Sequence, residues 1–135
     1  MPNPLHLNDQ NTAFELFLVN EAEGEKKITE KPFAGTSNTS EFILLKEDHT
    51  LGNLLSEHLK HHPNVLMAGY KIAHPNVPEC MIRLQTDGTK TPREIFVDVC
   101  KQLIAMYGHL GREFTREFEL RRMADSGEKE NGGRA

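Results

Sequence analysis

The segment Glu47-Asp48-His49-Thr50 contains the residue types that most readily do chemistry: two carboxylates, an imidazole and a hydroxyl, in direct succession. Carboxylates and imidazole can act as general acids and bases, and a hydroxyl beside them can act as a nucleophile. Such a nucleophile normally sits on a glycine-flanked turn beside an oxyanion hole, and no such pattern surrounds this segment. Instead, Asp48 or Thr50 can cap a helix start, where the acids face the positive end of the helix dipole. We therefore predict a helix start, no catalytic residues and no enzymatic activity.

A second group with possible chemistry is His58, His61 and His62. The spacing of His58 and His62 would place both on one helix face, as in a metal site. The zinc-protease pattern requires a glutamate directly after the first histidine, whereas this chain has Leu59 there. Histidines are also favoured in the last turn of a helix by its dipole. The aspartates of the chain lie on separate predicted elements, which argues against a catalytic magnesium site. The expectation is no metal and no cofactor.

The overall composition fits one domain of an intracellular protein. The chain has 135 residues and a net charge of −4, which argues against a free-standing nucleic-acid binder. No apolar run approaches the roughly 20 residues of a membrane helix, and the first residues lack the order of a secretory signal. Cys80 and Cys100 lie in apolar segments without metal-binding spacing. We expect both to be reduced, with a disulfide as the alternative.

The pattern of apolar residues predicts an α+β fold with the order strand-strand-helix-strand-strand-helix. We expect a four-stranded, mostly antiparallel sheet with two helices on one face. Residues 1–13 are predicted to be a flexible arm, 14–123 the folded domain and 124–135 a disordered tail. Strands are expected over 27–29, 41–46, 65–72 and 80–86, and helices over 50–61 and 92–123.

The two helices have clear sequence signals. Leucines at helical spacing form one stripe on the first helix, and Pro63 ends it. Thr91, Pro92 and Glu94 form a capping box at the start of the second. The strand candidate at 41–46 is apolar through its middle, so we expect it to be covered on both faces.

The second helix carries more apolar surface than one sheet can cover. On a helical wheel, one stripe contains Phe96, Val99, Cys100, Leu103, Tyr107, Leu110, Phe114 and Phe118. Further apolar residues lie beyond both edges of this stripe: Ile95, Val97, Ile104 and Met106. Together they span about 200°, against roughly 100° on a typical surface helix. A partner protein is therefore expected to cover the excess. The alternative is that Gly108 and Gly111 break the helix and its second half folds back.

Several segments resemble one family, the small alpha-like subunits of RNA polymerases, which includes archaeal subunit L and the dimerisation domain of the bacterial alpha subunit. The segments that carry this resemblance are Glu47-Asp48-His49-Thr50-Leu51-Gly52-Asn53, Val65-Leu66-Met67-Ala68-Gly69-Tyr70-Lys71, His74-Pro75 and Ile82-Arg83-Leu84-Gln85-Thr86. The N-terminal residues Phe14-Glu15-Leu16-Phe17-Leu18 and Glu23-Gly24-Glu25-Lys26-Lys27-Ile28 look like the version found in eukaryotic RNA polymerase II.

The resemblance implies an alpha-subunit dimerisation fold and a non-catalytic role in the nucleus. The chain would form a heterodimer with the larger alpha-like subunit, and the dimer would be the platform on which the two large catalytic subunits assemble. Nucleic acid would be contacted only through the complex. The equivalent subunit of RNA polymerase I and III, or of an archaeal-type polymerase, is the alternative. Both helices would form the interface, through Glu47, Asp48, His49, Thr50, Leu51, Asn53, Leu54, Leu55, Leu59, Phe96, Val99, Leu103, Ile104, Tyr107, Leu110, Phe114 and Phe118.

Overall fold

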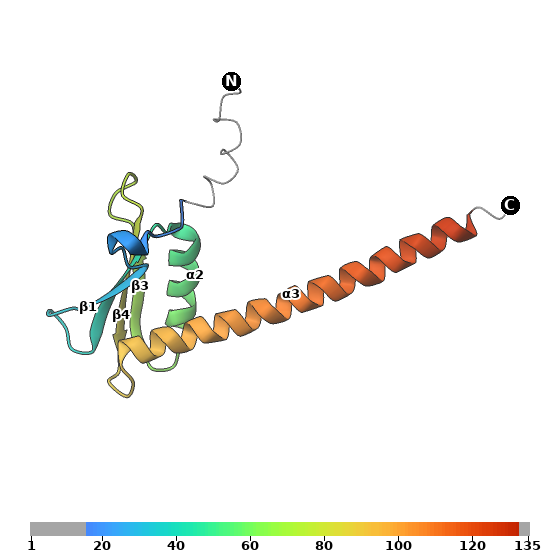
Figure 1. Ribbon diagram of the computed structural model, residues 1–135. Helices are drawn as coiled ribbons and strands as arrows, with labels where there is room; N and C mark the ends of the chain where they lie inside the picture. The colour runs from blue at the N-terminus through green and yellow to red at the C-terminus, as the bar shows by residue number, and fades with distance from the viewer. Residues whose placement is uncertain (1–15, 133–135) are drawn as a thin grey trace, which may run out of the picture. The chain divides into compact units, whose positions relative to one another are not determined.

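The computed structural model describes residues 16–132 and has the predicted order of elements. These are β1 (Ile28–Pro32), β2 (Thr39–Leu45), α2 (His49–Lys60), β3 (Val65–Lys71), β4 (Glu79–Thr86) and α3 (Pro92–Asn131), after a short 3-10 helix, η2 (Glu21–Glu23) (Figure 1). The chain divides into two compact units, the first ending at Val99 and the second beginning at Cys100. The predicted arm, residues 1–13, lies outside the described residues.

The four strands form one antiparallel sheet in the order β1-β2-β4-β3. Phe42 of β2 lies opposite Ile82 of β4, and Leu44 lies opposite Cys80. Because side chains alternate between the faces of a strand, these four residues share one face, and all four are buried. This face of the sheet is the centre of the core.

The opposite face of the sheet is open, so the expectation that the strand at 41–46 is covered on both sides is wrong. Ile43 and Leu45 point to this face and remain partly exposed. The same face carries an ion pair in which the Arg83 guanidinium donates to the Glu41 carboxylate. An apolar run therefore indicated a strand here, although only alternate residues are buried.

Within the first unit, both helices cover the buried face. α2 packs on β3 and β4, with Gly52 against Cys80. The first turns of α3 pack on β2, where the Phe96 and Phe42 rings stack with centroids 4.3 Å apart. The predicted arrangement of two helices on one face of an antiparallel sheet is confirmed. Among residues 16–132, the buried apolar side chains are Phe42, Leu44, Leu55, Leu59, Ala68, Cys80, Ile82, Leu84, Ile95, Phe96, Val99 and Leu103.

The start of α3 is the predicted capping box. The Thr91 N–H donates to Glu94 Oε2 at 2.8 Å, and the Glu94 N–H donates back to Thr91 Oγ1 at 3.3 Å. The first of these hydrogen bonds lowers the pKa of the Glu94 carboxyl, because it stabilises the charged form.

This lowered pKa leads to a prediction about acid stability. A carboxyl whose pKa is lower in the folded state stabilises the protein above its ordinary pKa, and this stabilisation is lost as the pH falls through the folded value. We expect Glu94→Gln to flatten the fall in melting temperature on acidification from pH 5 towards pH 3, because glutamine cannot titrate. Thermal melts of the two proteins across this range test it. Parallel pH profiles would contradict the assignment.

α3 is one continuous helix of 40 residues that passes through Gly108 and Gly111 without a break. The alternative in which the glycines reverse the chain is therefore wrong. The predicted end near Met123 and the predicted disorder from residue 124 also need correction, since the helix continues to Asn131. An ion pair of the helical i,i+4 type joins Arg121 to Asp125, in this last part, at 3.8 Å. The sequence reading treated residues 124–135 only as a polar tail.

Candidate subunit interface

The segment Glu47-Asp48-His49-Thr50, which we call the polar motif, caps the start of α2, as predicted. Asp48 is the N-cap, and its Oδ1 accepts a hydrogen bond from the Thr50 N–H at 2.9 Å. This hydrogen bond lowers the pKa of the Asp48 carboxyl. Asp48 and Thr50 are both exposed, so a charged carboxylate and a hydroxyl face solvent at this helix end.

The neighbouring residues of the motif each bind a different part of the first unit. The Glu47 carboxylate pairs with the Lys27 ammonium at 2.6 Å and is only 11% exposed. His49 Nδ1 lies 3.0 Å from the Tyr70 hydroxyl, and the two rings meet edge to face. These side chains therefore hold the β1, α2 and β3 regions together. They do not form a shared acid-base relay around Thr50.

Gly52 allows α2 to approach the sheet closely. A Cβ atom at this position would lie 2.5 Å from Tyr70 Cδ2 and 2.7 Å from Cys80 Sγ. The close approach at Gly52 is therefore to side chains of the same chain. The thiol beside it is buried, which raises the pKa of Cys80, and the charges of Glu47 and Asp48 raise it further.

Gly52→Ala is expected to destabilise the fold, because either Tyr70 or α2 must move to admit the methyl group. Overpacking of this kind costs about 1–3 kcal/mol. Urea unfolding monitored by circular dichroism measures the loss. Gly69→Ala is a suitable control, since a Cβ at Gly69 meets nothing within 4 Å. Equal stability of the two variants would show that the close approach at Gly52 is not required.

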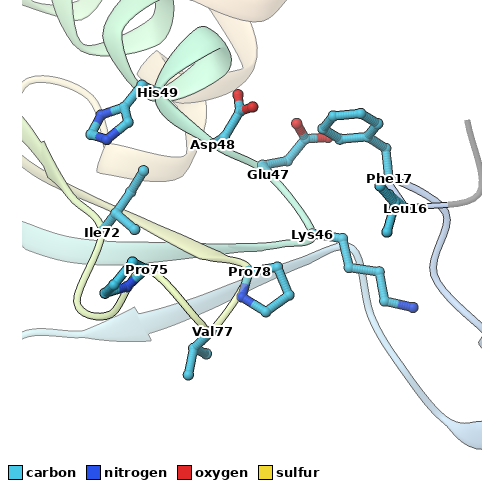
Figure 2. Close-up of a pocket in the computed structure, with 10 residues that line it drawn as sticks. All are labelled: Leu16, Phe17, Lys46, Glu47, Asp48, His49, Ile72, Pro75, Val77 and Pro78. Carbon is cyan, nitrogen blue, oxygen red and sulfur yellow. The ribbon is translucent and has the colours of Figure 1, made fainter. Parts of the chain in front are cut away.

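The motif also forms one wall of a cavity of about 710 Å³ (Figure 2). Lys46, Glu47, Asp48 and His49 line one side. The other lining residues are mainly apolar: Leu16, Phe17, Ile72, Pro75, Val77 and Pro78. All of them belong to the first unit. Sequence reasoning singled out the polar wall and missed the cavity, because its apolar wall comes from two loops distant in sequence.

Only part of the predicted α2 contribution to the interface is available on the surface. Leu55 and Leu59 are buried within the chain, with Leu59 0% exposed, so both are corrected from interface to core residues. Their side chains are covered by the sheet that α2 packs on. The predicted interface residues of α2 that keep exposed surface are His49, Thr50, Leu51, Asn53 and Leu54.

The predicted α3 residues divide in the same way. Phe96, Val99 and Leu103 are at most 6% exposed, so they also belong to the core and are corrected. The exposed members are Ile104, Tyr107, Leu110, Phe114 and Phe118, which we call the α3 stripe. Its two phenylalanine rings, Phe114 and Phe118, are 70% and 56% exposed and stack on each other with centroids 6.3 Å apart.

Other exposed apolar residues were not predicted as interface residues. Leu120 and Met123 lie on α3 beyond the stripe and are more than half exposed. Leu16 and Leu18 are exposed before β1. Both Leu120 and Met123 lie within the predicted helix 92–123, so a search for apolar residues in its last turn could have found them.

The remaining candidate residues have structural contacts. His58 Nδ1 lies 2.9 Å from the Leu54 carbonyl and His61 Nδ1 lies 2.7 Å from the Glu57 carbonyl, each one turn earlier in α2. A carbonyl oxygen can only accept, so both nitrogens carry the hydrogen. Among residues 16–132, no cluster of three or more histidine, cysteine or acidic side chains is arranged to hold a metal ion. Cys80 and Cys100 are both free thiols. No helix in the described part of the chain is long and apolar enough to span a membrane.

Comparison with known proteins gives consistent matches. Residues 39–113 match the family model of the RNA polymerase Rpb3/Rpb11 dimerisation domain. The chain is 34% identical to the DNA-directed RNA polymerase II subunit RPB11 of Schizosaccharomyces pombe, over 84% of this chain and 92% of that protein. It is 33% identical to the probable RPB11 of Caenorhabditis elegans, over 89% and 94% of the two chains. The crystal structure of RNA polymerase subunit L from Thermoplasma acidophilum has the same fold, with a TM-score of 0.57 and 22% identity over 70% of this chain and 92% of that one.

Proposed function

The chain belongs to the RNA polymerase Rpb3/Rpb11 dimerisation domain family, and on this premise we propose that it is a non-catalytic, structural subunit of RNA polymerase II. In this role it forms a heterodimer with the larger alpha-like subunit, and the heterodimer is the platform on which the two large catalytic subunits assemble. The segment matched by the family model, 39–113, lies inside the 14–123 region that we propose as the dimerisation domain.

The observation that carries the proposal is the exposed α3 stripe. Soluble proteins rarely leave a contiguous set of large apolar side chains in water, and such surfaces usually mark a binding site. Phe114 is 70% and Leu110 60% exposed, on a helix that is apolar along this side for several turns. A complementary helical surface on a partner would remove these side chains from water and so stabilise the complex.

The start of α2 supplies the polar part of the proposed interface. Asp48, His49, Thr50 and Asn53 are exposed, and such groups give an interface specificity through hydrogen bonds. Leu51 and Leu54 are partly exposed and add a smaller apolar area. Glu47 is largely buried against Lys27, so its proposed role is to hold the motif in place.

The non-catalytic and nuclear parts of the proposal rest on the relatives. The relatives are named as RNA polymerase II subunits, and this supports the nucleus as the proposed site of action. No chemistry is assigned to the motif, because its side chains already serve as a helix cap and as links within the fold.

The experiment that tests this function is affinity purification of the tagged chain from its source cells, followed by identification of the large subunits that accompany it. Recovery of the RNA polymerase II large subunits supports the proposal. Recovery of the large subunits of polymerase I and III instead would assign the chain to those enzymes. Recovery without any polymerase subunit would contradict the proposal.

A further inference from the structure

We propose that the cavity beside the start of α2 is a second docking site, which binds a segment of another polymerase subunit that carries a large apolar side chain next to a lysine or arginine. The inference rests on the proposed function, because it takes the assembled polymerase as the source of that segment. The site uses no residue of the α3 stripe, since none of its lining residues comes from α3. It adjoins the polar part of the proposed heterodimer interface, with which it shares Asp48 and His49.

The walls of the cavity are held in place before anything binds. The Lys27 ammonium donates to the Phe17 carbonyl at 2.8 Å and pairs with Glu47 on the opposite wall. The Lys46 ammonium donates to the Leu18 carbonyl at 2.9 Å and pairs with Glu25. A preformed site avoids much of the entropy cost of ordering loops on binding.

The shape and lining of the cavity fit an apolar side chain. Its loop wall is built from Ile72, Pro75, Val77 and Pro78, in which the prolines restrict the backbone. The Lys46 N–H donates to the Pro78 carbonyl and fixes this loop against the end of β2. Val77 is 45% exposed in the chain alone. A volume of about 710 Å³ lies in the range of ligand sites and can hold several side chains of a partner.

The charge of the cavity indicates what accompanies the apolar side chain. Lys46 and Glu47 are each neutralised by an ion pair with a residue outside the lining. Asp48 is exposed, and within residues 16–132 it forms no ion pair with a lysine or arginine. The lining of the cavity therefore includes one carboxylate without a basic partner, that of Asp48, together with apolar side chains (Figure 2). A lysine or arginine complements it, whereas the phosphates of nucleic acid are repelled.

The test places the photoreactive residue benzoylphenylalanine at position 77 of the full chain, within polymerase purified from cells. Irradiation is expected to join this residue to a segment of another subunit that has an aliphatic or aromatic side chain within two positions of a lysine or arginine. Mass spectrometry of the digested product identifies the segment. The matched control carries the same photoreactive residue in place of Met67, which is 47% exposed on the open face of the sheet, and is expected to react with a different segment or with none.

A second variant removes the negative charge of Asp48 but keeps its role as the helix cap. Asparagine caps helices as well as aspartate does, so Asp48→Asn keeps the helix start and removes the negative charge. We expect it to reduce the cross-link yield roughly two- to fivefold, the range for an exposed ion pair. The inference is overturned by no cross-link, by a cross-link to residues 1–15 of the same chain, by a target segment without a basic residue, or by an unchanged yield in Asp48→Asn.

The docking site and the proposed function can be contradicted separately. Assembled polymerase that contains the chain but gives no such cross-link overturns the docking site alone. Absence of the chain from purified polymerase overturns the proposed function, and the docking site with it.

Discussion

Replacing Phe114 and Phe118 together by aspartate is expected to abolish the heterodimer while leaving the fold of the chain intact. Both side chains are more than half exposed in the chain alone, so their removal costs little folding energy. In the complex they would be buried, and a carboxylate buried without a partner is strongly disfavoured. Aromatic residues also contribute most to binding at protein interfaces, with losses of 2 kcal/mol or more for a hot-spot residue.

The measurement for this variant is a pull-down through the tagged larger alpha-like subunit after co-expression, with circular dichroism of the variant as a check on folding. The control variant combines Gln102→Asp with His109→Asp. It adds the same two negative charges to α3, at exposed positions outside the α3 stripe. It should still be retained by the partner. Retention of the Phe114→Asp, Phe118→Asp chain at the wild-type level would remove the α3 stripe from the interface.

Leu59→Ala, in contrast, is expected to cause a large loss of stability in the chain itself. Leu59 is 0% exposed on the buried side of α2. Truncating a fully buried leucine removes its apolar contacts and leaves a cavity, at a cost of about 2–5 kcal/mol. Urea denaturation measures the change, and Leu54→Ala, at a partly exposed position of the same helix, should lose less. A loss below about 1 kcal/mol would mean that Leu59 is not a core residue.

The buried residues Leu55 and Leu103 are unsuitable positions for variants that test the interface. Aspartate at Leu55 or Leu103 would be expected to prevent assembly if those residues faced a partner. Since both are at most 6% exposed, a charged side chain there would unfold the chain first. Loss of assembly in such a variant would therefore not identify an interface. Variants of the exposed stripe avoid this ambiguity.

The order and type of the elements could be predicted because the signals are local. Each signal depends on residues only a few positions apart. The signals are the alternation of buried and partly exposed residues in β4, the capping box at Thr91 and Glu94, and the cap at Asp48. The length of α3 could not be predicted, because the polar, glycine-containing segment after Met123 has the composition of a tail. Only the ion pair between Arg121 and Asp125, four positions apart, also fits a helix there.

The division between core and surface could not be read from the helical wheel. The wheel correctly grouped Leu103 with Tyr107, but it cannot tell which part of a continuous stripe the chain itself covers. Leu103 is 6% and Tyr107 49% exposed. The contacts of the motif were equally inaccessible, since Lys27 with Glu47 and His49 with Tyr70 join residues about twenty positions apart. Only the packing of β1, α2 and β3 brings them together.

The most direct test of the account is to co-express the chain with the larger alpha-like subunit and determine the mass of the product by size-exclusion chromatography with light scattering. We expect a stable one-to-one complex, and poor solubility or self-association of the chain alone, because the α3 stripe is then left in water. A well-behaved monomer without affinity for the larger subunit would contradict it.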